Sequence, residues 1–197
     1  MCGRYYIASE DADRQIRALI DEINRREARR PDGKTVKTGE VFPSDDALVV
    51  ANSRAGNPRP FLMRWGFETG GRSLLINARS ETADSRPLFA PLTRERRLVV
   101  PATGYFEWER RGSARVKYLL TLNQSPAYMA GLYRLTENGG EFVILTKDAD
   151  PKIRFIHERM PVLFAWDAAM EWLSAECDFR RMVEGASGDV GFCECAG

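Results

Sequence analysis

At 197 residues, the chain is long enough to bury a substantial core as one large domain or two small ones. Its 44% hydrophobic and 29% charged residues are ordinary for a globular protein, and a net charge of +1 excludes a global basic field, so any nucleic-acid surface must be local. The sequence has no apolar run that could span a bilayer, no signal-peptide pattern and no secreted-type cysteine framework, and we therefore expect a cytoplasmic protein.

The chain opens with Met1-Cys2-Gly3-Arg4-Tyr5. Aminopeptidases generally remove an initiator methionine when a small residue follows, which leaves the α-amine and the thiol of Cys2 on adjacent carbons. Both groups titrate at about pH 8 to 8.5 in unperturbed models, so both nucleophilic forms are accessible at neutral pH. Such a 1,2-aminothiol condenses with an aldehyde to an imine and then closes a thiazolidine ring through its sulfur. The alternative is that Cys2 is an ordinary small hydrophobe in a strand, because reactive thiols need a specific microenvironment.

The first third of the chain predicts a short strand at residues 5–7 and one long helix. Ser9 and Asp11 offer N-caps for this helix, which would run through about Glu27. A strand is expected next at residues 47–51. The apolar residues of the helix recur at helical spacing, as one stripe against the core: Ile16, Leu19, Ile20 and Ile23.

From there the pattern is mostly β, with short apolar runs between turn signals. Two pairs of runs are separated by tight turns and indicate hairpins, one across Arg111-Gly112-Ser113 and one across Glu137-Asn138-Gly139-Gly140. The expected strands cover residues 61–67, 73–77, 97–102, 105–109, 116–122, 127–135, 141–146 and 162–164.

A helical pattern returns near the C-terminus, at residues 166–175 and 179–184. The tail, residues 185–197, is rich in Gly, Ala and Ser, and we expect it to be mobile. No repeat or linker divides the chain. The sequence therefore predicts one α+β domain over residues 1–184, with many short strands and a few covering helices.

Two residues stand out as candidates for proton transfer. His157 is the only histidine, and imidazole is the side chain that exchanges protons near neutral pH, although a lone histidine is more often structural. Glu107 lies in a run where strand alternation places it on one face with Tyr105. A carboxyl buried among aromatic rings has a raised pKa, which suits a general acid. The alternative is an edge strand with Glu107 in water.

Polar residues also follow an expected strand end, with Asn77, Arg79 and Glu81 at alternate positions. An amide can hold an oxygen atom and a guanidinium can hold a phosphate, although a plain polar loop fits the same residues. Residues 64–66 read equally well as a strand end with a covering Trp. Cys193-Glu194-Cys195 lacks the second ligand pair that zinc needs, and Gly-rich phosphate loops are absent, so we predict neither a metal nor a cofactor.

In chain order, seven motifs carry a resemblance to a known family: Met-Cys-Gly-Arg-Tyr at the start, Phe42-Pro43-Ser44, Met63-Arg64-Trp65-Gly66, Ile76-Asn77-Ala78-Arg79-Ser80-Glu81-Thr82, residues 97–108, Ala130-Gly131-Leu132-Tyr133 and His157-Glu158-Arg159-Met160-Pro161. Together they resemble the SOS response-associated peptidase (SRAP) family, whose members shield abasic sites in single-stranded DNA by covalent attachment. The resemblance runs to about Leu173. It implies antiparallel sheets in a barrel-like core with a few flanking helices.

The resemblance also implies roles for individual residues. Cys2 would attack the ring-opened aldehyde of the abasic sugar and end as a thiazolidine. Glu107 would shuttle protons as the sugar ring opens and the imine forms, and His157 would assist proton transfer and ring reversal. Asn77 would orient the amine or a sugar oxygen. Three residues are implied as DNA contacts: Arg4 and Arg79 on phosphates, and Trp65 as a stacking or wedging ring.

The implied partner is single-stranded DNA that contains abasic sites, bound by a monomer during the DNA damage response. The family name reflects a proposed self-processing peptidase activity that frees the amine of Cys2, and here removal of Met1 would suffice. Two other classes of function fit parts of the pattern. One is an N-terminal-nucleophile hydrolase that cleaves amide bonds with Cys2. The other is a non-catalytic, β-rich nucleic-acid binder, which would bind intact and abasic strands alike in a salt-sensitive way.

Overall fold

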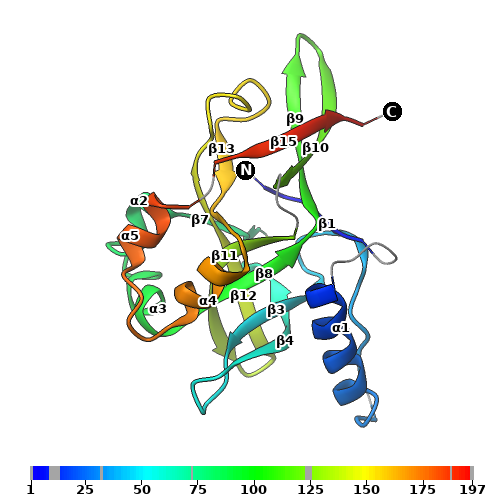
Figure 1. Ribbon diagram of the computed structural model, residues 1–197, viewed down its shortest axis with the longest axis vertical. Coiled ribbons are helices and arrows are strands. Elements are labelled where there is room, and N and C mark those ends of the chain that lie inside the picture. The colour runs from blue at the N-terminus through cyan, green and yellow to red at the C-terminus, as the bar shows by residue number, and fades with distance from the viewer. Residues whose placement is uncertain are drawn as a thin grey trace.

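The computed structural model describes residues 2–8, 14–31, 33–71, 73–122, 126–186 and 188–195. Over these residues it consists mostly of strands, with helices on two sides (Figure 1). The α+β class expected from the sequence is confirmed.

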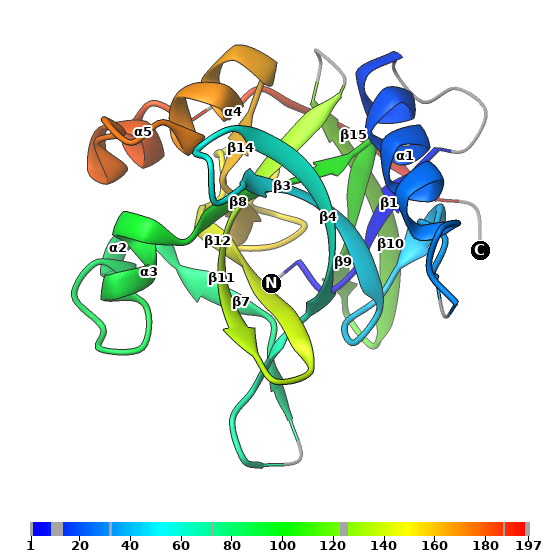
Figure 2. The same ribbon diagram turned by 90° about the horizontal axis from the view of Figure 1, so that it is seen from below.

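Five strands close into a barrel. They are β3 (Asp46–Asn52), β4 (Pro58–Trp65), β8 (Arg97–Ala102), β11 (Ala127–Thr136) and β12 (Gly139–Asp148). Each pairs with the next in the order β12, β4, β3, β8, β11, and β11 pairs again with β12, so the ring has no open edge (Figure 2). The barrel-like core is therefore confirmed. It is not wholly antiparallel, since β12 and β4 run parallel.

Shorter strands extend the barrel at β12 and β11. β7 (Asn77–Arg79) pairs parallel to β12, β13 (Arg159–Pro161) pairs antiparallel to β12, and β14 (Leu163–Phe164) pairs with β11. β5 (Phe67–Glu68) and β6 (Leu74–Leu75) form a separate ribbon. The expected strands at 61–67 and 73–77 are each divided in two, at Gly66 and at Ile76, and the strand expected at 162–164 is β14.

A second sheet of five strands packs beside the barrel, in the order β15-β10-β9-β1-β2. Its strands are β1 (Tyr5–Ile7), β2 (Gly39–Val41), β9 (Gly104–Arg111), β10 (Ala114–Leu122) and β15 (Val190–Glu194). The hairpin predicted across residues 111–113 is the β9–β10 pair. β15 lies within the tail that the sequence led us to expect as mobile, and residues 190–194 instead pair with β10 along their whole length.

The helices lie on opposite sides of the barrel (Figures 1 and 2). α1 (Arg14–Glu27) ends where the sequence predicted and buries Ile16 and Ile23, whereas the expected N-caps, Ser9 and Asp11, lie outside the described residues. The other side carries α2 (Ser80–Ala83), α3 (Ala90–Glu95), α4 (Trp166–Leu173) and α5 (Phe179–Glu184). In the described part of the chain, no helix is long and apolar enough to cross a membrane.

The barrel strands are apolar on both faces, and the two faces pack into different hydrophobic clusters. On β8, Leu98 and Val100 join the core cluster that contains Cys2, while Val99 joins the cluster under α4, with Trp172. This alternation follows from the period of two along a strand. It explains why residues 97–102 form an unbroken apolar run apart from Arg97.

Candidate active site around Cys2

Cys2 lies fully buried three residues before β1, and the ladder from β1 to β9 determines its surroundings. Tyr5 pairs with Tyr105, and the Phe106 N–H donates to the Arg4 carbonyl oxygen at 2.8 Å. The antiparallel register therefore carries the chain from Arg4 back toward Cys2 as β9 proceeds toward Glu107. The thiol of Cys2 makes a weak contact with the Arg4 carbonyl, with 3.8 Å between sulfur and oxygen.

Asn77 holds the backbone of Cys2 from the barrel side. Its Nδ2 donates to the Cys2 carbonyl oxygen at 2.9 Å, in a buried hydrogen bond across 75 residues of sequence. The position of Asn77 is set by β7, which pairs parallel to β12 with Asn77 beside Ile144. The Asn77 Oδ1 is buried without a hydrogen-bond partner among the described residues, so it is available to accept from a bound group.

Glu107 is buried in an interior strand, which excludes the alternative of a carboxylate in water at a sheet edge. Burial raises the pKa of Glu107 to about 7, and the positive charge at the amino-terminal end of the chain opposes this rise. A carboxyl group with this pKa exists in both protonation states at neutral pH. Glu107 is therefore suited to both donate and accept protons.

The thiol of Cys2 and the carboxyl of Glu107 are electrostatically coupled. Burial raises the pKa of the Cys2 thiol far above its usual value, and the negative charge of Glu107 raises it further. The resting sulfur is therefore a protonated thiol, and it needs a base when it reacts. Two buried phenols, Tyr5 and Tyr105, also lie near this thiol, and burial raises the pKa of each, so both remain neutral.

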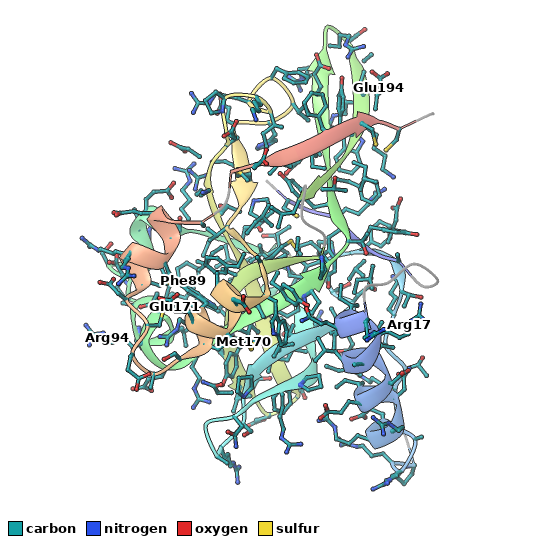
Figure 3. The ribbon with its side chains drawn as sticks, in the orientation of Figure 1. Arg17, Phe89, Arg94, Met170, Glu171 and Glu194 are labelled. Carbon is teal, nitrogen blue, oxygen red and sulfur yellow. The ribbon has the colours of Figure 1, made fainter. Side chains whose placement is uncertain are left out.

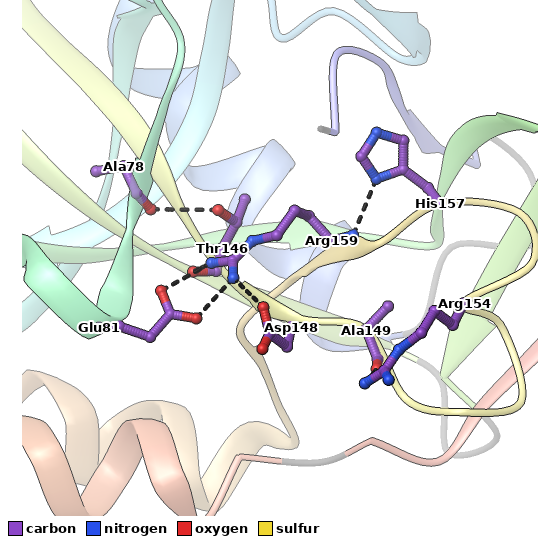
Figure 4. Close-up of polar contacts among 8 residues, drawn as sticks. All are labelled: Ala78, Glu81, Thr146, Asp148, Ala149, Arg154, His157 and Arg159. Atoms are coloured by element: carbon purple, nitrogen blue, oxygen red, sulfur yellow. Dashed lines mark hydrogen bonds and ion pairs between the residues drawn. The ribbon is translucent and has the colours of Figure 1, made fainter.

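His157 is half-buried in the loop that precedes β13. Its Nδ1 accepts a hydrogen bond from the Arg159 N–H at 2.9 Å, which assigns the proton of the neutral imidazole to Nε2 (Figure 4). Burial lowers the pKa of His157, and the positive charge at the amino-terminal end of the chain lowers it further. The imidazole is therefore neutral at pH 7 and lies within electrostatic reach of the first residues of the chain.

Trp65 does not lie on the surface. It is fully buried, its indole N–H donates to the Ile76 carbonyl oxygen at 3.0 Å, and its ring stacks on Phe142 with centroids 6.3 Å apart. Tyr5 packs against it at 5.3 Å. A base cannot reach a ring that is enclosed in this way, so the structure does not support the stacking role expected for Trp65. Its large apolar surface instead supports β1, the strand that follows Cys2.

The two arginines expected to hold phosphates lie outside the buried cluster. The Arg4 guanidinium pairs with Glu40 at 2.9 Å and lies over the rings of Phe42 and Trp108, at 4.5 and 5.0 Å from the centroids. Arg79 is exposed at the N-terminal end of α2. Arg4 therefore already has a carboxylate partner, whereas the Arg79 side chain projects into solvent.

Sequence reasoning assigned no role to Arg159, which ties the site to its surroundings. Its guanidinium donates to both oxygens of Glu81, at 2.7 and 2.8 Å, to the Thr146 carbonyl oxygen at 2.7 Å and to Asp148 (Figure 4). It thus joins α2 to β12 and β13, while its own backbone N–H orients His157. The sequence contained one signal for this role. Arg159 lies two residues after the only histidine, and a guanidinium can donate to a carboxylate through two N–H groups.

The structure therefore brings Cys2, Asn77 and Glu107 together, with His157 in electrostatic reach of the same end of the chain. A buried thiol, amide and carboxyl, with an imidazole within electrostatic reach, can move protons during attack on a carbonyl-type carbon. Within the described ranges, no group of three or more His, Cys, Asp or Glu side chains is arranged to hold a metal ion.

The sequence matches one family model, described as SOS response associated peptidase (SRAP), over residues 1–187. It is 30% identical over 198 residues to the abasic site processing protein YedK of Escherichia coli (strain K12), which covers 96% of this chain and 87% of that protein. It is 31% identical over 188 residues to the abasic site processing protein YoaM of Bacillus subtilis (strain 168), covering 88% of this chain and 79% of that protein.

Solved structures with the same fold are also known. A protein from Bacteroides thetaiotaomicron has a TM-score of 0.75 at 20% identity, covering 99% of this chain and 92% of that one. A phage-related protein from Bordetella bronchiseptica has a TM-score of 0.75 at 21% identity, covering 100% of this chain and 95% of that one. At these identities the likeness establishes the fold alone.

Proposed function

The chain belongs to the SOS response-associated peptidase (SRAP) family, and on that premise we propose that it processes abasic sites in single-stranded DNA by covalent attachment through Cys2. The names of its curated relatives support abasic DNA as the substrate. The observation that carries the proposal is the arrangement around Cys2, where Asn77 anchors the backbone of the nucleophile and Glu107, which is electrostatically coupled to the Cys2 thiol, has a pKa of about 7.

The reaction begins with a free amine on Cys2, which requires that whatever precedes this residue be removed. Methionine removal achieves this for Met1, and the self-processing peptidase activity implied by the family would achieve it for a longer leader. The abasic sugar equilibrates between a closed hemiacetal and an open aldehyde. The Cys2 nitrogen attacks the aldehyde carbon to give a carbinolamine, and loss of one water gives an imine.

The sulfur then closes the ring. The Cys2 thiol gives up its proton as sulfur bonds to the imine carbon, and the nitrogen takes up a proton, so ring closure is an isomerisation. The whole sequence releases one water and breaks no phosphodiester bond. The product is a thiazolidine between the protein and the lesion, and its formation is lyase-like imine chemistry without strand cleavage.

Glu107 is the proton carrier in this scheme. In its protonated form it donates to the leaving oxygen as water departs, and in its ionised form it accepts the proton of the Cys2 thiol. A pKa of about 7 makes both forms available. His157, which is neutral at pH 7, assists proton transfer at the sugar oxygens and reversal of the ring. Asn77 orients the amine through its buried Oδ1.

We propose that Arg79 and Arg4 hold the phosphates that flank the lesion. Arg79 is the better-placed candidate because its side chain is exposed at the end of β7, directly after Asn77 and Ala78. Contacts of this kind position the strand without reading its sequence. The protein acts as a monomer in this proposal, and residues 1–184 form the abasic-site processing domain.

A crosslinking assay tests the proposal. The purified protein is incubated with a single strand that carries one abasic site and, as a control, with the intact strand, and both samples are separated under denaturing conditions. We expect a slow-migrating adduct with the abasic strand only, absent in Cys2→Ala. Turnover of an amide substrate without DNA would instead favour an N-terminal-nucleophile hydrolase. Equal, salt-sensitive binding of both strands without an adduct would favour a non-catalytic binder.

A further inference from the structure

The last described segment of the chain lies along the loop that carries His157. We name Ala186 and residues 188–194 the C-terminal strap, and residues 149–158 the His157 loop. The C-terminal strap contacts the segment from Lys147 to Phe155 at four points, which occur in the same order along the two segments. They are the Lys147 Nζ donating to the Ala186 carbonyl oxygen at 2.7 Å, Gly188 against Asp150, the ion pair of Lys152 and Asp189 at 3.6 Å, and the rings of Phe155 and Phe192 at 5.3 Å.

Gly188 allows this close approach. A Cβ atom at that position would lie 3.0 Å from the Asp150 carboxylate oxygen, so the Asp150 side chain would have to shift to admit a larger residue. Two residues later, Val190 is buried in the same core cluster as Ile153 and Ile156 of the loop. The strap is therefore packed against the loop and does not merely pass over it.

The strap is anchored in turn to the sheet that carries Glu107. β15 pairs with β10 over residues 190–194, and β10 pairs with β9. In the β9–β10 ladder, Tyr118 lies directly opposite Glu107. The Tyr118 ring makes edge contacts with both Phe155 and Phe192, at centroid distances of 5.9 and 6.0 Å. Three rings thus connect the loop to the position opposite the buried carboxyl (the aromatic clasp: Tyr118, Phe155 and Phe192).

The bonds inside the His157 loop determine its local shape but not its distance from Glu107. The Ala149 N–H donates to the Glu158 carbonyl oxygen, the Ile153 N–H to Asp150, and the Arg154 guanidinium to Ala149. All of these join residues of the loop to each other. Besides its apolar core contacts, the aromatic clasp and the ion pair with Asp189 attach the outer part of the loop to the strap and to β10.

The outer rings of the clasp are exposed, Phe155 by 52% and Phe192 by 45%. Large apolar side chains with this exposure contribute less to global stability than core residues do, so their role is better sought in the loop that they hold. Glu194, at the end of β15, makes a further contact between the strap and the β9–β10 hairpin (Figure 3). Its carboxylate lies 3.5 Å from the Arg111 guanidinium.

We propose that the C-terminal strap positions His157 for the reaction at Cys2, with Phe192 as its principal positioning residue. The inference rests on the proposed function, in which the imidazole assists proton transfer. It goes beyond the family resemblance, because β15 lies after residue 187, where the family match ends. Loss of the Phe192 ring releases the outer loop, admits water to the imidazole and changes its position relative to the amino-terminal end of the chain.

The first test uses the fact that His157 is the only histidine in the chain, so its imidazole signals in an NMR titration need no assignment. Burial and the amino-terminal charge lower its pKa most, the backbone hydrogen bond with Arg159 and the charge of Glu158 raise it, and the charge of Arg159 lowers it. In Phe192→Ala we expect the titration midpoint to rise toward the unperturbed value of about 6.5, because the imidazole becomes hydrated. Phe192→Tyr should keep the wild-type midpoint, as should the control Leu135→Ala, an exposed position on β11.

The second test measures crosslinking to an abasic single strand. We expect Phe192→Ala to lower the rate constant at saturating DNA roughly tenfold, with an unchanged half-saturating DNA concentration, because the imidazole is misplaced while DNA contacts remain. Phe192→Tyr should restore the rate. Phe155→Ala should act like Phe192→Ala, and the double variant should be no worse than either, because the two rings act as one contact.

The two measurements separate the two proposals. A wild-type protein that forms no adduct would overturn the proposed function, while the titration would still decide the role of the strap. An unchanged His157 midpoint in Phe192→Ala, together with an unchanged crosslinking rate, would overturn the strap proposal. If Phe192→Ala proves poorly folded, Phe192→Leu retains the apolar bulk without the aromatic edge, and the same two outcomes apply.

Discussion

Glu107 is a carboxyl group in a buried environment that disfavours its charged form. Its pKa is raised to about 7 by burial, so the folded protein binds a proton there more tightly than the unfolded chain does. The resulting contribution to stability is fully present below the unfolded pKa of about 4.3 and is lost as the pH rises through about 7. The unfolding free energy of Glu107→Gln, relative to that of the wild type, should therefore rise by about 3 kcal/mol between pH 4 and pH 8. Urea unfolding at the two pH values measures this difference.

The same substitution should remove catalysis while it adds stability. We expect crosslinking by Glu107→Gln to be slower by roughly 10²- to 10⁴-fold, because an amide cannot exchange protons. The wild-type rate should change with pH around 7, and the rate of the variant should not. A variant that crosslinks at the wild-type rate with the same pH profile would show that the carboxyl is only structural.

Asn77 allows a second test at single-residue scale. Asn77→Ala removes the donor to the Cys2 carbonyl oxygen and leaves that buried acceptor unsatisfied, which should cost about 1–3 kcal/mol of unfolding free energy. Crosslinking should fall as well, since the backbone of the nucleophile is no longer fixed. The stability is measured by urea unfolding and the rate by the gel assay. A stable, fully active Asn77→Ala would contradict the role given to this hydrogen bond.

Residue-level prediction from the sequence succeeded where a local pattern carried the information. The alternation of Tyr105 and Glu107 on one strand face predicted that they share an environment, and both are buried. The burial of Trp65 could not be read from Arg64-Trp65-Gly66, because it depends on Phe142 of β12 and on the Ile76 carbonyl oxygen between β6 and β7. Electrostatic partners such as those of Arg159 are equally non-local.

At the scale of elements, one buried arginine joins two helices. The Arg97 guanidinium donates to four carbonyl oxygens at 2.6–2.8 Å, those of Thr93 and Arg94 at the end of α3 and those of Trp172 and Ser174 at the end of α4. A cation at a helix C-terminus satisfies unpaired carbonyls and interacts favourably with the helix dipole. The interaction fixes both helices to the barrel strand β8.

Arg97→Met should therefore destabilise the fold by about 3 kcal/mol or more, because it leaves several buried carbonyls without donors. Urea unfolding measures the loss. Crosslinking should be unchanged at a temperature where the variant is folded, since Arg97 is remote from Cys2. A loss below about 1 kcal/mol would show that water replaces the guanidinium at both helix ends.

Element prediction failed where pairing partners decide the outcome. Residues 185–197 have a composition typical of a mobile tail, yet β15 pairs with β10 because that strand offers an edge. The short helices α2 and α3 were not expected from the sequence, although Pro91 near the start of α3 is a favourable signal for a helix N-terminus. Both helices are short, so their own propensity is weak and packing on the barrel supports them.

At the scale of the whole molecule, β12 closes the barrel, because it pairs with β11 and with β4. It pairs with β11, β4, β7 and β13, and two of these pairings are parallel. Neither the closure nor the parallel pairings have a signature in the local sequence, and the barrel was expected only through the family resemblance. β12 also positions the site. It pairs with β7, which carries Asn77, and with β13, which begins two residues after His157.

The central claim is that the amine and the thiol of Cys2 react together at one aldehyde carbon. Intact-mass analysis of the protein before and after incubation with an abasic oligonucleotide tests it most directly. We predict a protein that begins at Cys2, and an adduct with the mass of both partners minus one water. An adduct that forms in Cys2→Ala, or an active protein that retains Met1, would contradict the account.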